Sequence, residues 1–102
     1  MDSILALQTP ADIQRALASR MREARIGQDL TQQTLARNSG VNLATLRRFE
    51  RTGEVSLKHL LRLCHALGRL DDFNGILQPP PAATLAELEA QIHRPRRKRG
   101  TR

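Results

Sequence analysis

Apolar residues recur at helical spacing in two stretches of the chain. The first follows Thr9 and Pro10, which suit a helix cap and the first helical position, and it runs to Gly27. Its apolar positions are Ile13, Ala16, Leu17, Met21 and Ala24. The second has Ser56 as its cap and closes at Gly68, and its apolar positions are Leu57, Leu60, Leu61, Cys64 and Leu67. Each pattern predicts an amphipathic helix.

A shorter helical pattern with a turn follows the first stretch. Thr31 can cap a helix over residues 32–38 through its hydroxyl. The expected buried positions of this helix are Leu35 and Ala36. Gly40 then supplies the positive φ that a sharp corner between helices needs, and Val41 gives the corner an apolar anchor. The pattern predicts a short helix that ends in a tight turn.

A second short helix starts directly after this turn. Asn42 is a good cap, and Leu46 and Phe49 lie three residues apart on one side. The residues expected on other sides are Leu43, Ala44, Arg47, Arg48 and Arg51. A face with three arginines suits the major groove of DNA, because guanidinium groups match the two acceptors of guanine and the phosphate oxygens alongside. Residues 31–53 therefore predict a DNA-reading element.

The same residues resemble the helix-turn-helix of the lambda-repressor/Cro-like family, also called the XRE family. Counting from Gln32, that family has a small residue at the fifth position, glycine at the ninth and an aliphatic residue at the fifteenth. Here these positions hold Ala36, Gly40 and Leu46. Glu50 and the sequence LKHLLRLCHALG at 57–68 also match. The resemblance covers about residues 10 to 77 and implies an all-α, five-helix DNA-binding domain.

The resemblance implies roles for individual residues. Gln32 is expected to contact a phosphate at the start of its helix, with Gln33 beside it. Arg25 and Glu50 are expected to form an ion pair that holds the second helix of the motif at its angle. The full set of expected DNA contacts is Gln32, Gln33, Asn42, Leu43, Ala44, Thr45, Arg47, Arg48 and Arg51. Within it, Arg47 and Arg48 are the expected base readers, Arg51 is a backbone contact, and Thr45 either bonds a phosphate or fills space.

Two departures from the family pattern affect this interpretation. The family usually has a glycine two residues after the glutamate. In this chain that position holds Thr52, and Gly53 comes one residue later, so the loop after the second helix is expected to differ. Leu43 and Ala44 stand where the family favours polar side chains. They can touch a thymine methyl but cannot hydrogen-bond a base edge. Base choice then depends on Arg47 and Arg48.

Length and composition narrow the class of protein. A chain of 102 residues has room for one small domain, whose core is marginal without help, and this favours a homodimer. Tryptophan and tyrosine are absent, which argues against a binder of single-stranded RNA, because such proteins stack bases on aromatic side chains. The sequence contains neither a membrane span nor a signal pattern, and the lone Cys64 excludes an internal disulfide. These features favour a cytoplasmic protein.

The net charge of +7 is unevenly distributed. Residues 10–77 contain eleven basic and seven acidic side chains, whereas residues 94–102 contain six basic and none acidic. The basic tail can bind DNA, bind a partner or remain solvated. Its candidate contacts are Arg94, Arg96, Arg97, Lys98 and Arg99. Charge by itself favours nucleic acid and membranes equally, so the case for DNA depends on residues 31–53.

The regions before and after the helix-turn-helix pattern divide into further segments. Residues 1–9 form an N-terminal extension with an apolar cluster of Ile4, Leu5 and Leu7. Residues 70–77 predict a short fifth helix that completes the domain over 10–77. Residues 78–83 contain three successive prolines and predict a stiff spacer. Residues 84–93 predict a short amphipathic helix with a stripe of Leu85, Leu88 and Ile92, and residues 94–102 predict a disordered tail.

Metal and enzyme chemistry have little support in the sequence. Cys64 and His65 are adjacent and so point about 100° apart on a helix, while His93 lies beyond the prolines. Asp71 and Asp72 lack a partner base, and no phosphate-binding loop or activated nucleophile is recognisable. No metal, no cofactor and no catalytic residues are expected.

The patterns together predict a sequence-specific repressor that binds a two-fold symmetric operator in double-stranded DNA as a homodimer. Residues 53–77, with the spacer and basic end, are similar to small regulators of the HipB type. This similarity implies an autoregulating antitoxin of a HipBA-like toxin–antitoxin operon, with a HipA-type kinase as its partner. The alternative is an adaptor that uses the same fold to bind protein with little reading of DNA sequence. The apolar residues Leu43 and Ala44 are compatible with that alternative.

Overall fold

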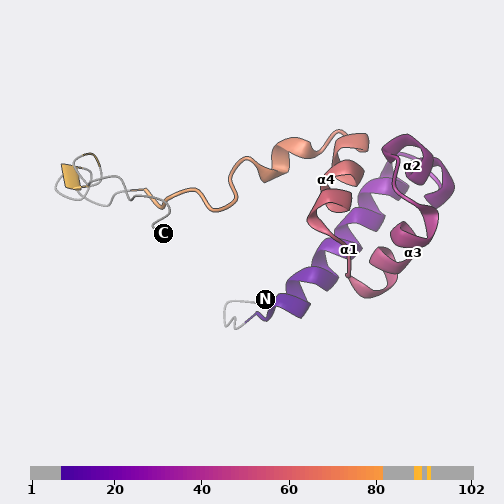
Figure 1. The fold of residues 1–102 in the computed structure, drawn as a ribbon, viewed down its shortest axis with the longest axis horizontal. Coiled ribbons are helices and arrows are strands. Elements are labelled where there is room, and N and C mark those ends of the chain that lie inside the picture. The colour runs from indigo at the N-terminus through magenta and orange to yellow at the C-terminus, as the bar shows by residue number, and fades with distance from the viewer. Residues whose placement is uncertain (1–7, 82–88, 91, 93–102) are drawn as a thin grey trace, which may run out of the picture.

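The computed structural model describes residues 8–81, 89, 90 and 92. Residues 8–81 contain four α-helices, one short 3-10 helix and no strands, and residues 89, 90 and 92 are helical. The elements in order are α1 (Pro10–Gly27), α2 (Gln32–Ser39), α3 (Leu43–Thr52), α4 (Leu57–Ala66) and the 3-10 helix η2 (Leu70–Phe73). Helix α1 packs on α3, α2 packs on both α3 and α4, and α4 contacts η2 (Figure 1).

Local side-chain caps explain where α1 begins. The Thr9 hydroxyl accepts a hydrogen bond from the Asp12 backbone N–H at 3.1 Å, and the Asp12 carboxylate accepts one from the Thr9 N–H at 3.1 Å. The Thr9 N–H, followed by the Thr9 hydroxyl, lowers the pKa of Asp12, because hydrogen bonding to the carboxylate favours its ionised form. Pro10 occupies the first turn. The predicted span of this helix is confirmed.

The corner between α2 and α3 is built as the sequence predicts. Thr31 caps α2 by accepting the Thr34 N–H at 3.0 Å, and Asn42 caps α3 by accepting the Ala44 N–H at 2.7 Å. Gly40 has φ of 74° and its N–H donates to Ala36 O. The left-handed conformation at Gly40 lets α3 start shortly after α2 ends, and Val41 is buried beneath the corner.

An apolar core joins the four helices. Its most deeply buried side chains are Leu35, Leu46, Phe49 and Leu63. The stripe predicted on α4 differs from the structure at two residues: Leu57, which it included, is 66% exposed, and Leu63, which it omitted, is fully buried. Leu63 shares a face with Leu60 and Leu67, because residues three, four and seven apart lie on the same side of a helix.

The predicted fifth helix over residues 70–77 is not an α-helix. A Schellman arrangement at Gly68 closes α4, with the Arg69 N–H donating to Cys64 O and the Gly68 N–H to His65 O. Only the single 3-10 turn Leu70–Phe73 follows. Asn74 and Gly75 are weak helix formers, and Leu77 adopts φ of 62°, which no right-handed helix allows. The chain then leaves the helical body through Gln78–Pro81 (Figure 1).

Several predictions concern residues outside the described ranges. They are the apolar cluster at Ile4, Leu5 and Leu7, most of the helix over 84–93, and the tail with Arg94, Arg96, Arg97, Lys98 and Arg99. Among the described residues, no helix is both long enough and apolar enough to cross a membrane.

Candidate nucleic-acid interface

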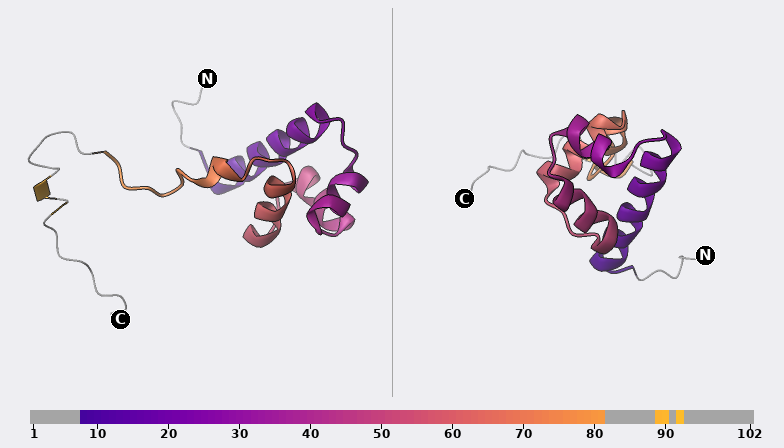
Figure 2. Two further views of the ribbon diagram at one scale, coloured as in Figure 1. Left: turned by 90° about the horizontal axis from the view of Figure 1, so that it is seen from above. Right: turned by 90° about the vertical axis from the view of Figure 1, so that its right-hand side faces the viewer.

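The exposed side of α3 carries one coherent stripe. Ala44, Arg47, Arg48 and Arg51 lie on this side, whereas Leu46 and Phe49 on the opposite side are buried. The four residues are three, four and seven positions apart, so they share one helix face, which we call the reading face. Helices α2 and α3 lie together at the end of the domain away from the exit of the chain (Figures 1 and 2). The reading face is therefore open to a large partner.

The structure corrects the expected position of Leu43 and limits that of Asn42. Leu43 packs against the core instead of standing clear on the reading face. It lies one residue before Ala44, which turns it about 100° from that face. The Asn42 side-chain oxygen is already used to cap α3. Thr45 is half-buried and, one residue after Ala44, is turned about 100° from it in the other direction.

The three arginines of the reading face are in different states. Arg48 forms an ion pair with Glu54, a contact absent from the sequence interpretation, and both side chains are exposed. For Arg47 and Arg51, no ion pair is found with any described residue. A surface pair of this kind contributes little to stability, so it is easily exchanged for another anion. Arg47 and Arg51 carry positive charge that is not neutralised within the described domain.

A buried polar network holds α3 against α1 and α2. Arg25 of α1 donates to both carboxylate oxygens of Glu50, from Nε to Oε2 at 2.7 Å and from Nη2 to Oε1 at 3.0 Å. These side chains are 10% and 5% exposed. Arg25 Nη1 also donates to Leu30 O at 2.8 Å. The network therefore links three segments and sets the angle of the reading face.

Gln32 belongs to this network, which the sequence interpretation did not foresee. Its Nε2 donates to Glu50 Oε1 at 2.9 Å, so one of its two amide protons is engaged inside the domain. Gln33 and Arg37 are exposed four residues apart on the same side of α2. Arg37 was missed as a candidate contact. Its spacing from Gln33 is the signal that the sequence contained.

Gly53 fastens the end of α3 to α1. It has φ of 87°, and its carbonyl accepts the Gln14 side-chain N–H at 3.3 Å. A Cβ at this position would lie 2.9 Å from the Gln14 backbone. Thr52, at the family's glycine position, completes the helix, and its hydroxyl donates to Arg48 O at 2.8 Å. The shift of glycine by one residue thus lengthens α3 and moves the closing turn to Gly53.

These features define a helix-turn-helix DNA-binding domain: two short helices meet at a glycine corner, and the second presents arginines while the first braces it. The model of the family described as Helix-turn-helix matches residues 21–73, just over half of the chain. The chain belongs to this family, in its XRE-like branch. That family is a DNA-binding regulatory domain and not an enzyme family. A search of curated proteins finds no match.

Proposed function

We propose that this protein is a transcriptional repressor that reads a two-fold symmetric operator as a homodimer in the cytoplasm. The observation that carries the proposal is the reading face on α3, whose Arg47 and Arg51 have no ion-pair partner within the described domain. In a helix-turn-helix, the second helix lies in the major groove and the first crosses the backbone. Repression then follows where the operator overlaps the promoter.

Each contact has a physical role in this proposal. Arg47 reads guanine first, because its guanidinium needs no rearrangement, and Arg48 must exchange Glu54 for DNA. Arg51 and Thr45 bind phosphates. Ala44 touches a thymine methyl, with Leu43 at the margin. Gln32 and Gln33 bind a phosphate at the start of α2, where free N–H groups favour an anion, and the Asn42 amide lies at the corner.

The test compares binding to DNA from upstream of the protein's own gene with binding to scrambled DNA. Arg47→Ala and Arg48→Ala are each expected to weaken binding to the upstream DNA by about 1 to 3 kcal/mol, with a much smaller effect on scrambled DNA. Arg22→Ala is the matched control. It removes the same charge from an exposed position on α1 that lies outside α2, α3 and the groove lined by Arg20.

Fluorescence anisotropy at two salt concentrations provides the measurement. Equal losses on both DNAs for Arg47→Ala and Arg48→Ala would contradict base reading. Those losses, together with no preference of the parent protein for upstream DNA, would favour the protein-binding adaptor. The same titrations without residues 94–102 separate the contribution of the tail arginines and Lys98 from that of α3.

The proposal extends to an antitoxin whose partner is a HipA-type kinase. Its support is the similarity of residues 53–77 to HipB-type regulators, together with the exposed apolar side chains Leu57 and Leu77. Co-expression with a kinase encoded beside the gene is expected to relieve growth arrest by that kinase and to yield a co-purifying complex. Persistent arrest with no complex would leave a plain repressor. Reading-face variants serve as controls, because they are expected to keep the complex.

A further inference from the structure

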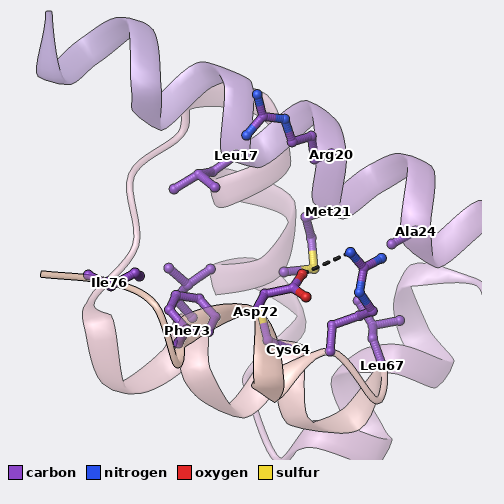
Figure 3. A pocket seen from close by; sticks show the side chains of 11 residues that line it. Leu17, Arg20, Met21, Ala24, Cys64, Leu67, Asp72, Phe73 and Ile76 are labelled. Carbon is purple, nitrogen blue, oxygen red and sulfur yellow. Dashed lines mark ion pairs between the residues drawn. The ribbon is translucent and has the colours of Figure 1, made fainter. Parts of the chain in front are cut away.

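A groove opens between α1, α4 and η2, on a part of the domain that the DNA-binding proposal does not use. It encloses about 260 Å³. Its apolar walls are Leu17, Met21, Leu60, Cys64, Phe73 and Ile76. Figure 3 shows Leu17 and Met21 on one side and Phe73 and Ile76 on the other. We call it the α1–α4 groove.

The groove is apolar inside, and its charged lining residues are two arginines and one carboxylate. Ile76 is 54% exposed, which leaves apolar surface uncovered. The charged residues are Arg20, Arg69 and Asp72, and the carboxylate of Asp72 pairs with Arg69 at 2.8 Å, the ion pair dashed in Figure 3. An occupant that fits this surface has an apolar stripe with a carboxylate beside it. Such a shape is typical of an amphipathic helix laid in a groove.

We infer that the α1–α4 groove binds residues 84–92 of a second copy of this chain. The sequence TLAELEAQI predicts a helix whose stripe is Leu85, Leu88 and Ile92, at positions that share one face. Glu89, four residues after Leu85 and three before Ile92, lies beside this stripe and complements Arg20. A nine-residue helix does not persist by itself in water, so it needs a surface to cover its stripe.

The path of the chain makes the occupant a second copy and not the same copy. The Gln78 side chain donates to Asn74 O at 2.6 Å, which fixes where the spacer begins, and Pro79, Pro80 and Pro81 follow. The described residues 78–81 lead away from the helical body (Figure 1). An extended spacer over 78–83 would span about 19 Å at roughly 3.1 Å per residue, whereas a helix over 84–92 would span only about 13 Å. A helix that turned straight back from the far end of such a spacer would end short of Ile76 and would not reach Leu17 or Met21.

Reciprocal exchange of this segment produces a closed dimer with two equal interfaces. The groove residues come from α1, α4 and the segment around η2, so the reading face stays free for DNA. The inference rests on the proposed function and supplies the surface for its dimer. Its test measures oligomeric state without DNA, so its failure is distinguishable from failure of base reading.

Sedimentation of the full chain tests the exchange. Ile76→Arg, in the groove, and Leu88→Arg, in the segment, are each expected to weaken dimerisation by about 100-fold or more. A mixture of the two variants is expected to recover a heterodimer, because the intact segment of the first enters the intact groove of the second. Each variant alone has no intact interface and stays monomeric.

Leu77→Arg is the matched control for Ile76→Arg. Leu77 is 96% exposed and does not line the groove, so its replacement is expected to leave the dimer unchanged. Circular dichroism verifies that each variant is folded. Cys64 provides a second readout, since it lines the groove and its alkylation is expected to slow as protein concentration rises.

Four results would overturn the inference. The first is a monomeric parent protein at a concentration on the order of 100 μM, where a specific interface of even modest affinity is populated. The second is a dimer that survives both variants, and the third is a mixture of the variants that stays monomeric. The fourth is a dimer that is abolished by Leu5→Arg but not by Leu88→Arg. The last result would assign the groove to the N-terminal apolar cluster.

Discussion

Replacing Glu50 with glutamine is expected to lower the free energy of unfolding by about 3 to 5 kcal/mol. Glu50 accepts two hydrogen bonds from Arg25 and one from Gln32, and its side chain is 5% exposed. Glutamine keeps the shape but removes the charge and turns an N–H2 group toward the donors of the guanidinium. The buried Arg25 is then left without a counter-charge. Urea unfolding followed by circular dichroism measures the loss.

Glu54→Gln is the matched control for this prediction. It makes the same chemical change four residues away, in the pair with Arg48 whose side chains are 63% and 57% exposed. Its effect is expected to stay within about 0.5 kcal/mol, because exposed pairs contribute little. Equal effects of the two substitutions would show that Glu50 is not acting as a buried counter-charge. The double variant Arg25→Met with Glu50→Leu is expected to recover much of the loss, since apolar pairs often replace buried ion pairs without cost.

Replacing Gly53 with alanine is expected to destabilise the domain by about 2 to 5 kcal/mol, the sum of a backbone cost and a packing cost. The left-handed backbone at φ of 87° costs about 1 to 2 kcal/mol for a residue with a Cβ. The Cβ would also lie 2.9 Å from the Gln14 backbone, and relieving such overpacking costs about 1 to 3 kcal/mol more. Because Gly53 holds the end of α3 on α1, weaker binding to upstream DNA is expected as well.

Gly68→Ala separates the two causes. Gly68 has a similar φ of 74°, but a Cβ at this position would meet no atom within 4 Å, so only the backbone cost of about 1 to 2 kcal/mol applies. Gly40→Ala, at φ of 74° and equally open, is expected to behave like Gly68→Ala. Thermal and urea unfolding of the three variants provide the comparison. A loss at Gly53 no larger than at Gly68 would mean that α1 moves away at little cost.

The sequence predicted the helix starts correctly because the groups that create them are neighbours. Thr9, Thr31, Asn42 and Ser56 each accept a backbone N–H two or three residues ahead, and no distant residue is needed. The left-handed glycine at the corner is equally local. The prediction of a fifth helix over 70–77 was wrong, because it relied on the apolar residues of this segment. Asn74 and Gly75 within it do not sustain a helix.

Contacts between distant residues explain what the sequence did not predict about the candidate site. Gln32 bonds Glu50 across 18 residues, and Gln14 bonds Gly53 across 39. Leu43 packs on the core because the core extends beneath it, although its spacing placed it with the exposed residues. The Arg48 pair with Glu54 depends on how the chain turns at Gly53. Periodicity identifies a face of a helix but not the side chains that other helices bring to it.

By itself, the sequence determined the four α-helices, the glycine corner and the arginines available to DNA, because caps, glycines and apolar spacing act within one or two turns of chain. Only the tertiary structure decided which arginine is paired, where Gln32 points, why Gly53 allows no side chain and where the α1–α4 groove opens. These features arise from side chains that are far apart in sequence and meet only when the helices pack.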